Sequence, residues 1–245
     1  MRWAGPLESA ALLTVLRVPA RAAASTRGVL PWAPLVGLVL GAIAAGVGTA
    51  GAYLVSPSAG AVLAIAALAA LTRGLHLDGL ADTADGLGPL RGRERALEVM
   101  RQGDVGPFGV VTLLLTVLLQ VAAATTLLEA DRGWTALAAA PFVARLAMAR
   151  TGLPGVPMAA GSALGQSVAG TVSAGWLAGW VFVAAALLTV ADPALVASAA
   201  AGLLAAELLL RRARARLGGV TGDVMGAMGE TAATVTLLVA AAALG

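Results

Sequence analysis

The sequence predicts an all-α, polytopic membrane protein with about seven transmembrane spans and short interfacial helices. Of its 245 residues, 59% are hydrophobic and only 12% are charged, whereas a soluble domain carries about 25% charged residues. Apolar runs long enough to cross a hydrocarbon core of about 30 Å recur along the whole chain. Because lipid offers the backbone no hydrogen bonds, these runs are expected to be helices. No separate soluble domain is visible, so residues 1–245 are expected to form a single integral-membrane domain.

The expected elements follow one another with short connections. Residues 7–16 come first and are expected to form a short interfacial or re-entrant helix that ends near Pro19. The seven apolar runs cover residues 33–55, 58–73, 107–128, 134–150, 172–190, 194–210 and 231–245. The second and the last run are short, so we expect them to be tilted, partly buried or continued by the amphipathic segments beside them. Residues 151–170 are rich in Gly and Pro and are expected to form a flexible loop that closes over a substrate.

The arginines predict how the chain is oriented in the membrane. If all seven runs cross, the N-terminal segment, the 73–106 loop and the 211–230 loop lie on one side, and they hold most of the arginines. The opposite side keeps only Arg132. The positive-inside rule therefore predicts that the long loops are cytoplasmic and that the C-terminus is outside. The same pattern argues against nucleic-acid binding, because the arginines flank apolar runs and few aromatic residues are available to stack on bases.

The stretch "GLHLDGLADTADGLG", residues 74–88, holds three aspartates beside the only histidine of the chain, His76. On a helix of 100° per residue, Asp78, Asp82 and Asp85 fall within an arc of about 60° and therefore share a face. Like charges at this spacing repel one another, and more strongly beside a membrane than in water. A divalent cation removes the repulsion, and a set of oxygen ligands favours Mg²⁺. The alternative is a solvated surface loop, since Asp-Gly pairs are typical of turns.

A second polar segment, "GGVTGDVMGAMGET", covers residues 218–231. Asp223 and Glu230 are seven residues apart and therefore share a helical face. Glycines accompany the acids in both segments, and Gly79 and Gly222 are expected to let a bulky substrate approach the backbone. Either segment alone is typical of helix packing through small residues. Together they resemble a two-sided site in which carboxylates from two helices hold Mg²⁺ and the metal holds phosphates.

Three arginines are candidates for contacts with phosphate, because a guanidinium group binds phosphate through paired hydrogen bonds. They are Arg73, Arg101 and Arg145. Arg145 is costly inside a membrane span, which favours a functional role for it. His76 lies about 160° from Asp78 around a helix and is therefore off the aspartate face. An interfacial role for His76 is as well supported as a catalytic one.

These motifs together resemble the cobalamin synthase family, the adenosylcobinamide-GDP ribazoletransferases. The resemblance rests on "GLHLDGLADTADGLG", "RERALEVM", "GPFGVV" and "LGGVTGDVMGAMGE", in this order and at similar distances from one another. The start "LLTVLRVP" and the opening "PLVGLVLG" of the first span also fit, so the resemblance covers nearly the whole chain. Many members carry Asp-Ser-Arg where this chain has Gln102, Gly103 and Asp104, which argues against a charge role for that stretch.

The resemblance implies that the single domain is catalytic and lies in the bacterial cytoplasmic membrane, with its active-site loops on the cytoplasmic side. It implies Mg²⁺-dependent transfer of the adenosylcobinamide-phosphate moiety from adenosylcobinamide-GDP to α-ribazole or its 5′-phosphate. GMP is released, and adenosylcobalamin or its phosphate is formed at the last stage of vitamin B12 assembly. The expected partners are these small molecules and membrane lipid, and a homo-oligomer is left open.

The chemistry of this reaction fits the residues already described. A ribose hydroxyl attacks the phosphorus that carries the cobinamide arm, and negative charge builds up on the diphosphate and on the departing GMP. The expected metal ligands are Asp78, Asp82, Asp85, Asp223 and Glu230. The expected catalytic side chains, one of which accepts the hydroxyl proton, are His76, Asp82, Asp85 and Asp223.

Three other function classes stay open at this point. A CDP-alcohol phosphotransferase shares a D-G-x-x-A-like core but needs an arginine after that alanine, where this chain has Asp82 after Ala81. A prenyl-diphosphate transferase also uses two aspartate-rich helices, but it usually keeps an Asn-Asp opening that is missing here. A transporter lines its ion path with acids near mid-span, whereas the acids here are expected at the cytoplasmic ends of spans.

Overall fold

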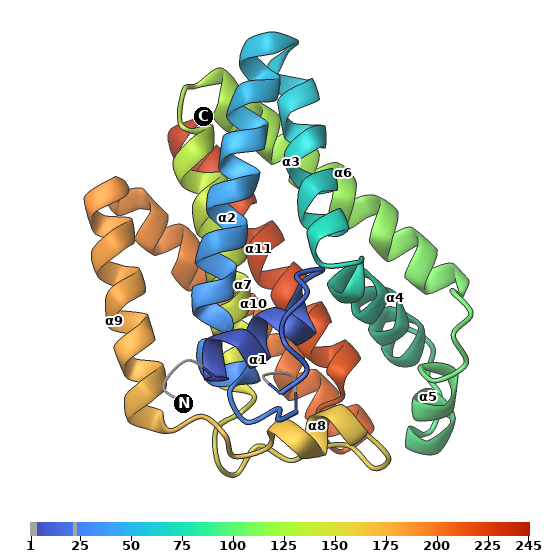
Figure 1. Ribbon diagram of the computed structural model, residues 1–245. Coiled ribbons are helices and arrows are strands. Elements are labelled where there is room, and N and C mark those ends of the chain that lie inside the picture. The colour runs from blue at the N-terminus through green and yellow to red at the C-terminus, as the bar shows by residue number, and fades with distance from the viewer. Residues whose placement is uncertain (1–3, 22–23) are drawn as a thin grey trace.

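The computed structural model describes residues 4–21 and 24–245, and in this part of the chain it has eleven α-helices and no β-strand. The predicted all-α fold is therefore confirmed. Long helices form an upright bundle, and short helices lie at one end of it (Figure 1). In chain order the helices are α1 (Ala4–Leu13), α2 (Val29–Leu54), α3 (Pro57–Leu71), α4 (Leu75–Leu87), α5 (Arg93–Val99), α6 (Pro107–Glu129), α7 (Gly133–Arg150), α8 (Ala163–Val168), α9 (Ala174–Ala191), α10 (Pro193–Leu217) and α11 (Gly222–Leu244).

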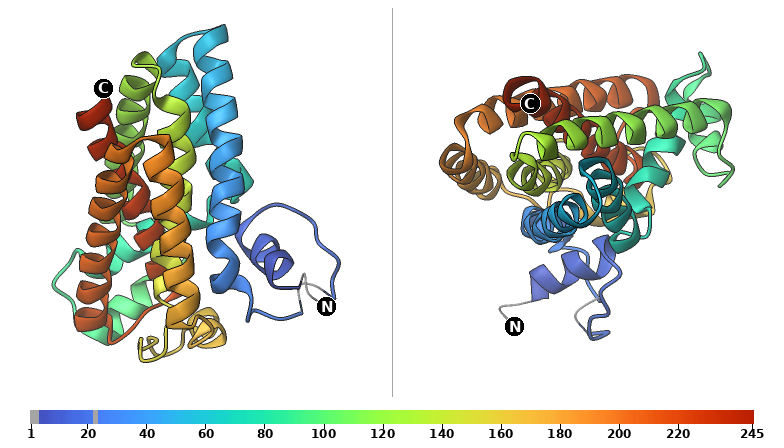
Figure 2. Two further views of the ribbon diagram at one scale, coloured as in Figure 1. Left: turned by 90° about the vertical axis from the view of Figure 1, so that its left-hand side faces the viewer. Right: turned by 90° about the horizontal axis from the view of Figure 1, so that it is seen from above.

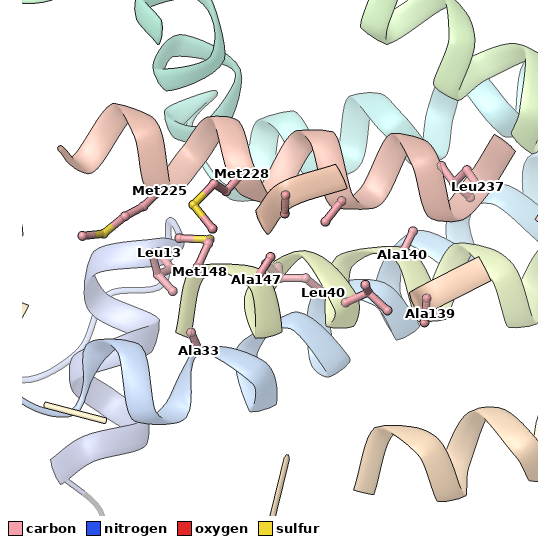
Figure 3. Packing of buried hydrophobic residues seen from close by; sticks show 14 of the residues in the cluster. Leu13, Ala33, Leu40, Ala139, Ala140, Ala147, Met148, Met225, Met228 and Leu237 are labelled. Atoms are coloured by element: carbon pink, nitrogen blue, oxygen red, sulfur yellow. The ribbon is translucent and has the colours of Figure 1, made fainter. Parts of the chain in front are cut away.

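Helix α7 is the centre of the bundle and packs against α2, α11, α10 and α9 (Figure 2). Six of its fourteen buried positions are alanines, which allow neighbouring helices to approach closely. At the lower end of α7, Met148 meets Met225 and Met228 of α11 and Leu13 of α1 (Figure 3). Methionine side chains are flexible and fill irregular gaps, so they complete the core where these three helices converge.

Within the described residues, five helices are long and apolar enough to cross a membrane: α2, α6, α9, α10 and α11. Helices α3 and α4 would make a sixth only as a pair, and they are bent by 88° where they join. Helix α7 is not sufficiently apolar, because Arg145 and Arg150 lie on it. The predicted count of seven spans is therefore not confirmed. The last predicted run, 231–245, is the end of α11, which begins at Gly222 as the neighbouring amphipathic segment suggested.

The bend between α3 and α4 sets the direction of the aspartate motif. Arg73 and Gly74 both adopt positive φ angles, 57° and 67°, and Gly74 is the N-cap of α4. The chain thus turns sharply after Leu71 and runs nearly perpendicular to α3. We therefore treat α4 as a helix at the membrane boundary, outside the spanning segments.

The predicted short helix near the N-terminus is present as α1, which ends at Leu13 rather than near Pro19 and lies outside the bundle beside the lower part of α2 (Figure 2). The carboxylate of Glu8 accepts a hydrogen bond of 2.6 Å from the backbone N–H of Gly28, the N-cap of α2. A negative charge at a helix N-terminus is stabilised by the helix dipole. Arg73 Nη2 donates to the carbonyl oxygen of Leu12 at 3.0 Å. Helix α1 therefore connects the start of α2 with the bend before α4.

The segments that were predicted to share one side of the membrane meet at one end of the bundle. Helices α4, α5 and α8 gather there, whereas the C-terminus lies at the opposite end (Figure 1). Residues 151–170 are fixed at this end by an isolated β-bridge between Met158 and Val220 and by a 2.9 Å hydrogen bond from Ala159 N–H to the Val220 carbonyl oxygen. The closing motion of this loop and the cytoplasmic orientation of this end stay predictions.

Candidate active site

The candidate active site lies where α4 crosses the start of α11. A Cβ atom on Gly79 would lie 2.7 Å from the carbonyl oxygen of Asp223, and one on Gly226 would lie 3.2 Å from the Cα atom of His76. Glycine at both positions therefore lets the two backbones touch. Gly79 was expected to let a substrate approach the backbone, whereas in the structure the backbone of Asp223 on α11 covers it.

The crossing brings together carboxylates that are far apart in the sequence. Asp78 is exposed and Asp82 half-buried on α4, and both lie close enough to Asp223 for their charges to interact. Burial, followed by the negative charges of Asp78, Asp223 and Asp85, raises the pKa of Asp82 to about 6. The Thr221 hydroxyl donates to Asp223 Oδ2 at 3.2 Å, and Thr221 also caps α11. The repulsion among the three carboxylates is what a bound cation would relieve.

Asp85 faces a different neighbour from Asp78 and Asp82. Its carboxylate accepts hydrogen bonds from the backbone N–H groups of Gly106 (2.7 Å) and Gly109 (3.0 Å) and thereby caps the N-terminus of α6. The N-cap residue of α6, Gly106, has no side chain that could do this. We therefore assign Asp85 to helix capping, where the sequence analysis expected a metal ligand or a catalytic group. In the sequence, Gly106 followed by Pro107 indicated the start of a helix whose first N–H groups need a hydrogen-bond acceptor from another part of the chain.

Glu230 is separated from the aspartates along α11. Seven residues of helix correspond to about 10 Å, so Glu230 lies deeper in the bundle than Asp223 although both share a face. Its carboxylate accepts a 2.9 Å hydrogen bond from Gln120 Nε2, which also donates to Thr234 Oγ1. With Arg145, these groups line a cavity of ≈ 40 Å³ between α3, α6, α7 and α11. The neighbours of Glu230 are Gln120 and Arg145 rather than the aspartates, and metal ligation by Glu230 stays a prediction.

Arg145 and His76 are both buried. The Arg145 side chain is inside the bundle, with Nη2 3.3 Å from Nδ1 of His76. Arg145 therefore contacts His76 inside the bundle, and its contact with a phosphate stays a prediction. His76 lines an apolar pocket of ≈ 70 Å³ together with Gly222 and Asp223.

Arginines flank the aspartates in two open hollows. One hollow, of ≈ 210 Å³, is lined by Arg101, Gly222 and Asp223, and Arg101 Nη2 donates to the carbonyl oxygen of Ala160 at 3.3 Å. The other, of ≈ 540 Å³, is lined by Arg73 and Asp78. Acidic and basic groups thus alternate across the site, as a metal-bound phosphate ester requires.

The donor set suits Mg²⁺ better than a metal that needs a complete protein cage. Among residues 4–21 and 24–245, no three His, Asp or Glu side chains form a group that could hold a metal ion. Mg²⁺ is usually held by one or two carboxylates, with water and substrate phosphates completing its shell. Of the expected ligands, Asp78, Asp82 and Asp223 lie close enough together for their charges to act on one another.

The comparisons with known proteins agree with each other. The sequence model of a family described as cobalamin-5-phosphate synthase matches residues 6–241. Three relatives are named adenosylcobinamide-GDP ribazoletransferase. The protein of Frankia casuarinae is 41% identical over 231 residues, covering 85% of this chain and 83% of its own. That of Bradyrhizobium diazoefficiens is 38% identical over 233 residues (86% and 82%), and that of a Nocardioides species is 40% identical over 229 residues (93% and 93%). No solved structure gives a significant match.

Proposed function

Because the chain belongs to the cobalamin-5-phosphate synthase family, we propose that it is a transferase that joins adenosylcobinamide-GDP to α-ribazole or α-ribazole 5′-phosphate. The observation that carries this proposal is the crossing of α4 and α11. It puts Asp78 and Asp82 beside Asp223, between the hollows lined by Arg73 and Arg101.

In the proposed reaction, a ribose hydroxyl oxygen bonds to the phosphorus that carries the cobinamide arm. The bond between that phosphorus and the bridging diphosphate oxygen breaks, and GMP leaves with the electron pair. Asp82 of α4 and Asp223 of α11, with Asp78 beside them, would hold Mg²⁺ together with phosphate oxygens of the substrate. Mg²⁺ held there would supply positive charge against the charge that builds up on the diphosphate and on the departing GMP. Arg73 and Arg101 contact phosphate oxygens from either side.

Asp223 is proposed to accept the proton of the attacking hydroxyl. It lines both the ≈ 210 Å³ hollow with Arg101 and the ≈ 70 Å³ apolar pocket with His76. A carboxylate between a phosphate-binding hollow and an apolar pocket can contact adenosylcobinamide-GDP on one side and the α-ribazole acceptor on the other. Its hydrogen bond from Thr221 fixes its orientation.

The end of the bundle that holds α4, α5 and α8 faces the cytoplasm of a bacterial plasma membrane in this proposal. The arginine-rich loops 73–106 and 211–230 lie at this end. The positive-inside rule assigns such loops to the cytoplasm. Both substrates would then reach the site directly from the compartment in which nucleotides are made.

The test supplies purified protein in detergent or nanodiscs with adenosylcobinamide-GDP and α-ribazole, with and without Mg²⁺, and measures GMP and the corrinoid product. We expect GMP release that requires Mg²⁺ and is lost in Asp82→Asn. The matched control is Asp104→Asn, an exposed aspartate of the neighbouring loop that should behave as wild type. Wild-type turnover by Asp82→Asn, or product from CDP-diacylglycerol or a prenyl diphosphate instead, would overturn the proposal.

A further inference from the structure

His76 is a buried polar side chain that the proposed reaction does not use. It is 1% exposed, and it is the only histidine of the chain. Its Nε2 atom is buried and has no hydrogen-bond partner among the described residues. A buried polar atom without a partner is unusual and calls for an explanation. One explanation is that its partner is a ligand.

Arg145 determines which ring nitrogen of His76 carries the proton. A guanidinium group has only donors, so His76 Nδ1, 3.3 Å from Arg145 Nη2, must accept. A neutral ring with an accepting Nδ1 carries its proton on Nε2. The unpartnered atom of His76 is therefore a hydrogen-bond donor. A donor of this kind pairs with an acceptor atom, and it is not free to take up a proton.

The pocket that His76 lines is otherwise almost entirely apolar. Helices α1, α2, α4, α8 and α11 each contribute to it, mainly through leucine, valine and methionine side chains. Its polar groups are His76 and Asp223. Such a pocket selects an apolar body with one well-placed acceptor atom. A phosphate or a sugar offers too many polar atoms to be accommodated there.

From this geometry we infer that Arg145 holds His76 as an Nε2–H donor, which hydrogen-bonds the base of the α-ribazole acceptor inside the apolar pocket. This inference rests on the proposed function. Of the two substrates, the acceptor carries a flat apolar bicyclic ring whose unsubstituted ring nitrogen accepts one hydrogen bond. Arg145 is then a positioning residue, and His76 binds the acceptor without taking its hydroxyl proton. The ribose would extend from the pocket toward Asp223.

The single histidine makes a direct test available. In protein labelled with ¹⁵N-histidine and held at one pH, the ring nitrogen signals identify the tautomer without assignment work. We expect the Nε2–H tautomer in wild type. Addition of α-ribazole alone should shift the Nε2–H signal, whereas adenosylcobinamide-GDP alone should leave it unchanged. The Nδ1–H tautomer, or no response to α-ribazole, would overturn the inference, and neither result depends on turnover.

A double variant tests the role of Arg145. Because Arg145→Leu would leave Glu230 without its cation, it is combined with Glu230→Gln, and we expect the Nδ1–H tautomer to appear in this double variant. A double variant that keeps the wild-type tautomer would show that Arg145 does not set the tautomer of His76. If the double variant does not fold, the wild-type spectrum and the kinetics of the His76 variants still test whether His76 binds the α-ribazole ring.

Steady-state kinetics distinguish two roles of His76, binding of the α-ribazole ring and acceptance of the hydroxyl proton. His76→Leu should raise the KM for α-ribazole about tenfold, as for one lost hydrogen bond, with little change in kcat or in the KM for adenosylcobinamide-GDP. His76→Gln, whose amide nitrogen occupies a position similar to Nε2, should restore most of the loss. A large fall in kcat in both variants would instead make His76 the proton acceptor. If wild type releases GMP but His76→Leu binds α-ribazole normally, only this inference fails.

Discussion

Substituting Gly79 by alanine tests whether the close crossing of α4 and α11 builds the active site. A Cβ atom there would lie 2.7 Å from the Asp223 carbonyl oxygen, about 0.7 Å closer than ordinary contact allows, in a region packed too tightly to yield freely. The helices must separate by a similar amount. Alanine is worth about 1 kcal/mol more than glycine in a helix, while overpacking costs about 1–3 kcal/mol. The net loss of stability should therefore be small, at most about 2 kcal/mol.

The effect on activity should be much larger than the effect on stability. A shift of about 1 Å between catalytic groups can cost about a hundredfold in rate, so we expect a loss of this order in kcat/KM for Gly79→Ala. Gly226→Ala, where the nearest atom of His76 is 3.2 Å away, should lose less. Gly175→Ala on α9, with no atom within 4 Å of the added Cβ, is the matched control and should be unchanged. GMP release and thermal unfolding are measured on all three. Wild-type kcat/KM in Gly79→Ala, or equal losses in Gly175→Ala, would refute the reasoning.

Three further predictions concern capping, protonation and orientation. Asp85→Asn should destabilise the protein by about 1–3 kcal/mol, because one acceptor for the N–H groups that begin α6 is lost, and thermal unfolding that matches wild type would contradict the capping role. Since the pKa of Asp82 is raised to about 6, its carboxyl gains a proton below that pH. The Mg²⁺ concentration for half-maximal GMP release should then rise by about tenfold per pH unit below pH 6, and a flat dependence would argue against metal binding by Asp82. The chain has no cysteine, so single Arg95→Cys and Tyr53→Cys variants can be labelled cleanly. In intact cells an impermeant maleimide should react with the second and spare the first, and the reverse pattern would invert the proposed orientation.

Features that depend on the local pattern of residues were predicted well from the sequence. The apolar runs identified most of the long helices, and the spacing of Asp78 and Asp82 correctly placed them on one face of a helix. The pairing of the two aspartate segments followed from their chemistry, since repelling carboxylates need a common cation. Local periodicity was sufficient for these conclusions.

What the sequence did not predict depends on tertiary contacts. Asp223 and Glu230 share a face, but periodicity says nothing of depth, so the partners of Glu230 in the bundle could not be foreseen. The 60° arc included Asp85 with the other aspartates, yet its carboxylate turns to the N-terminus of α6, 21 residues farther along the chain. Helix α7 was predicted to be a span because most of its residues are apolar. The burial of Arg145 against His76 depends on tertiary packing, which the apolar pattern does not reveal.

The central claim is that carboxylates from α4 and α11 hold one metal ion together with the diphosphate of the donor. It is tested most directly by replacing Mg²⁺ with Mn²⁺ and measuring bound metal by electron paramagnetic resonance in the presence of adenosylcobinamide-GDP. We expect tight binding of Mn²⁺ by wild type and by Asp104→Asn, and affinity lowered at least about tenfold in both Asp82→Asn and Asp223→Asn. Wild-type affinity in Asp223→Asn would contradict the claim, because the metal would then be held by α4 alone.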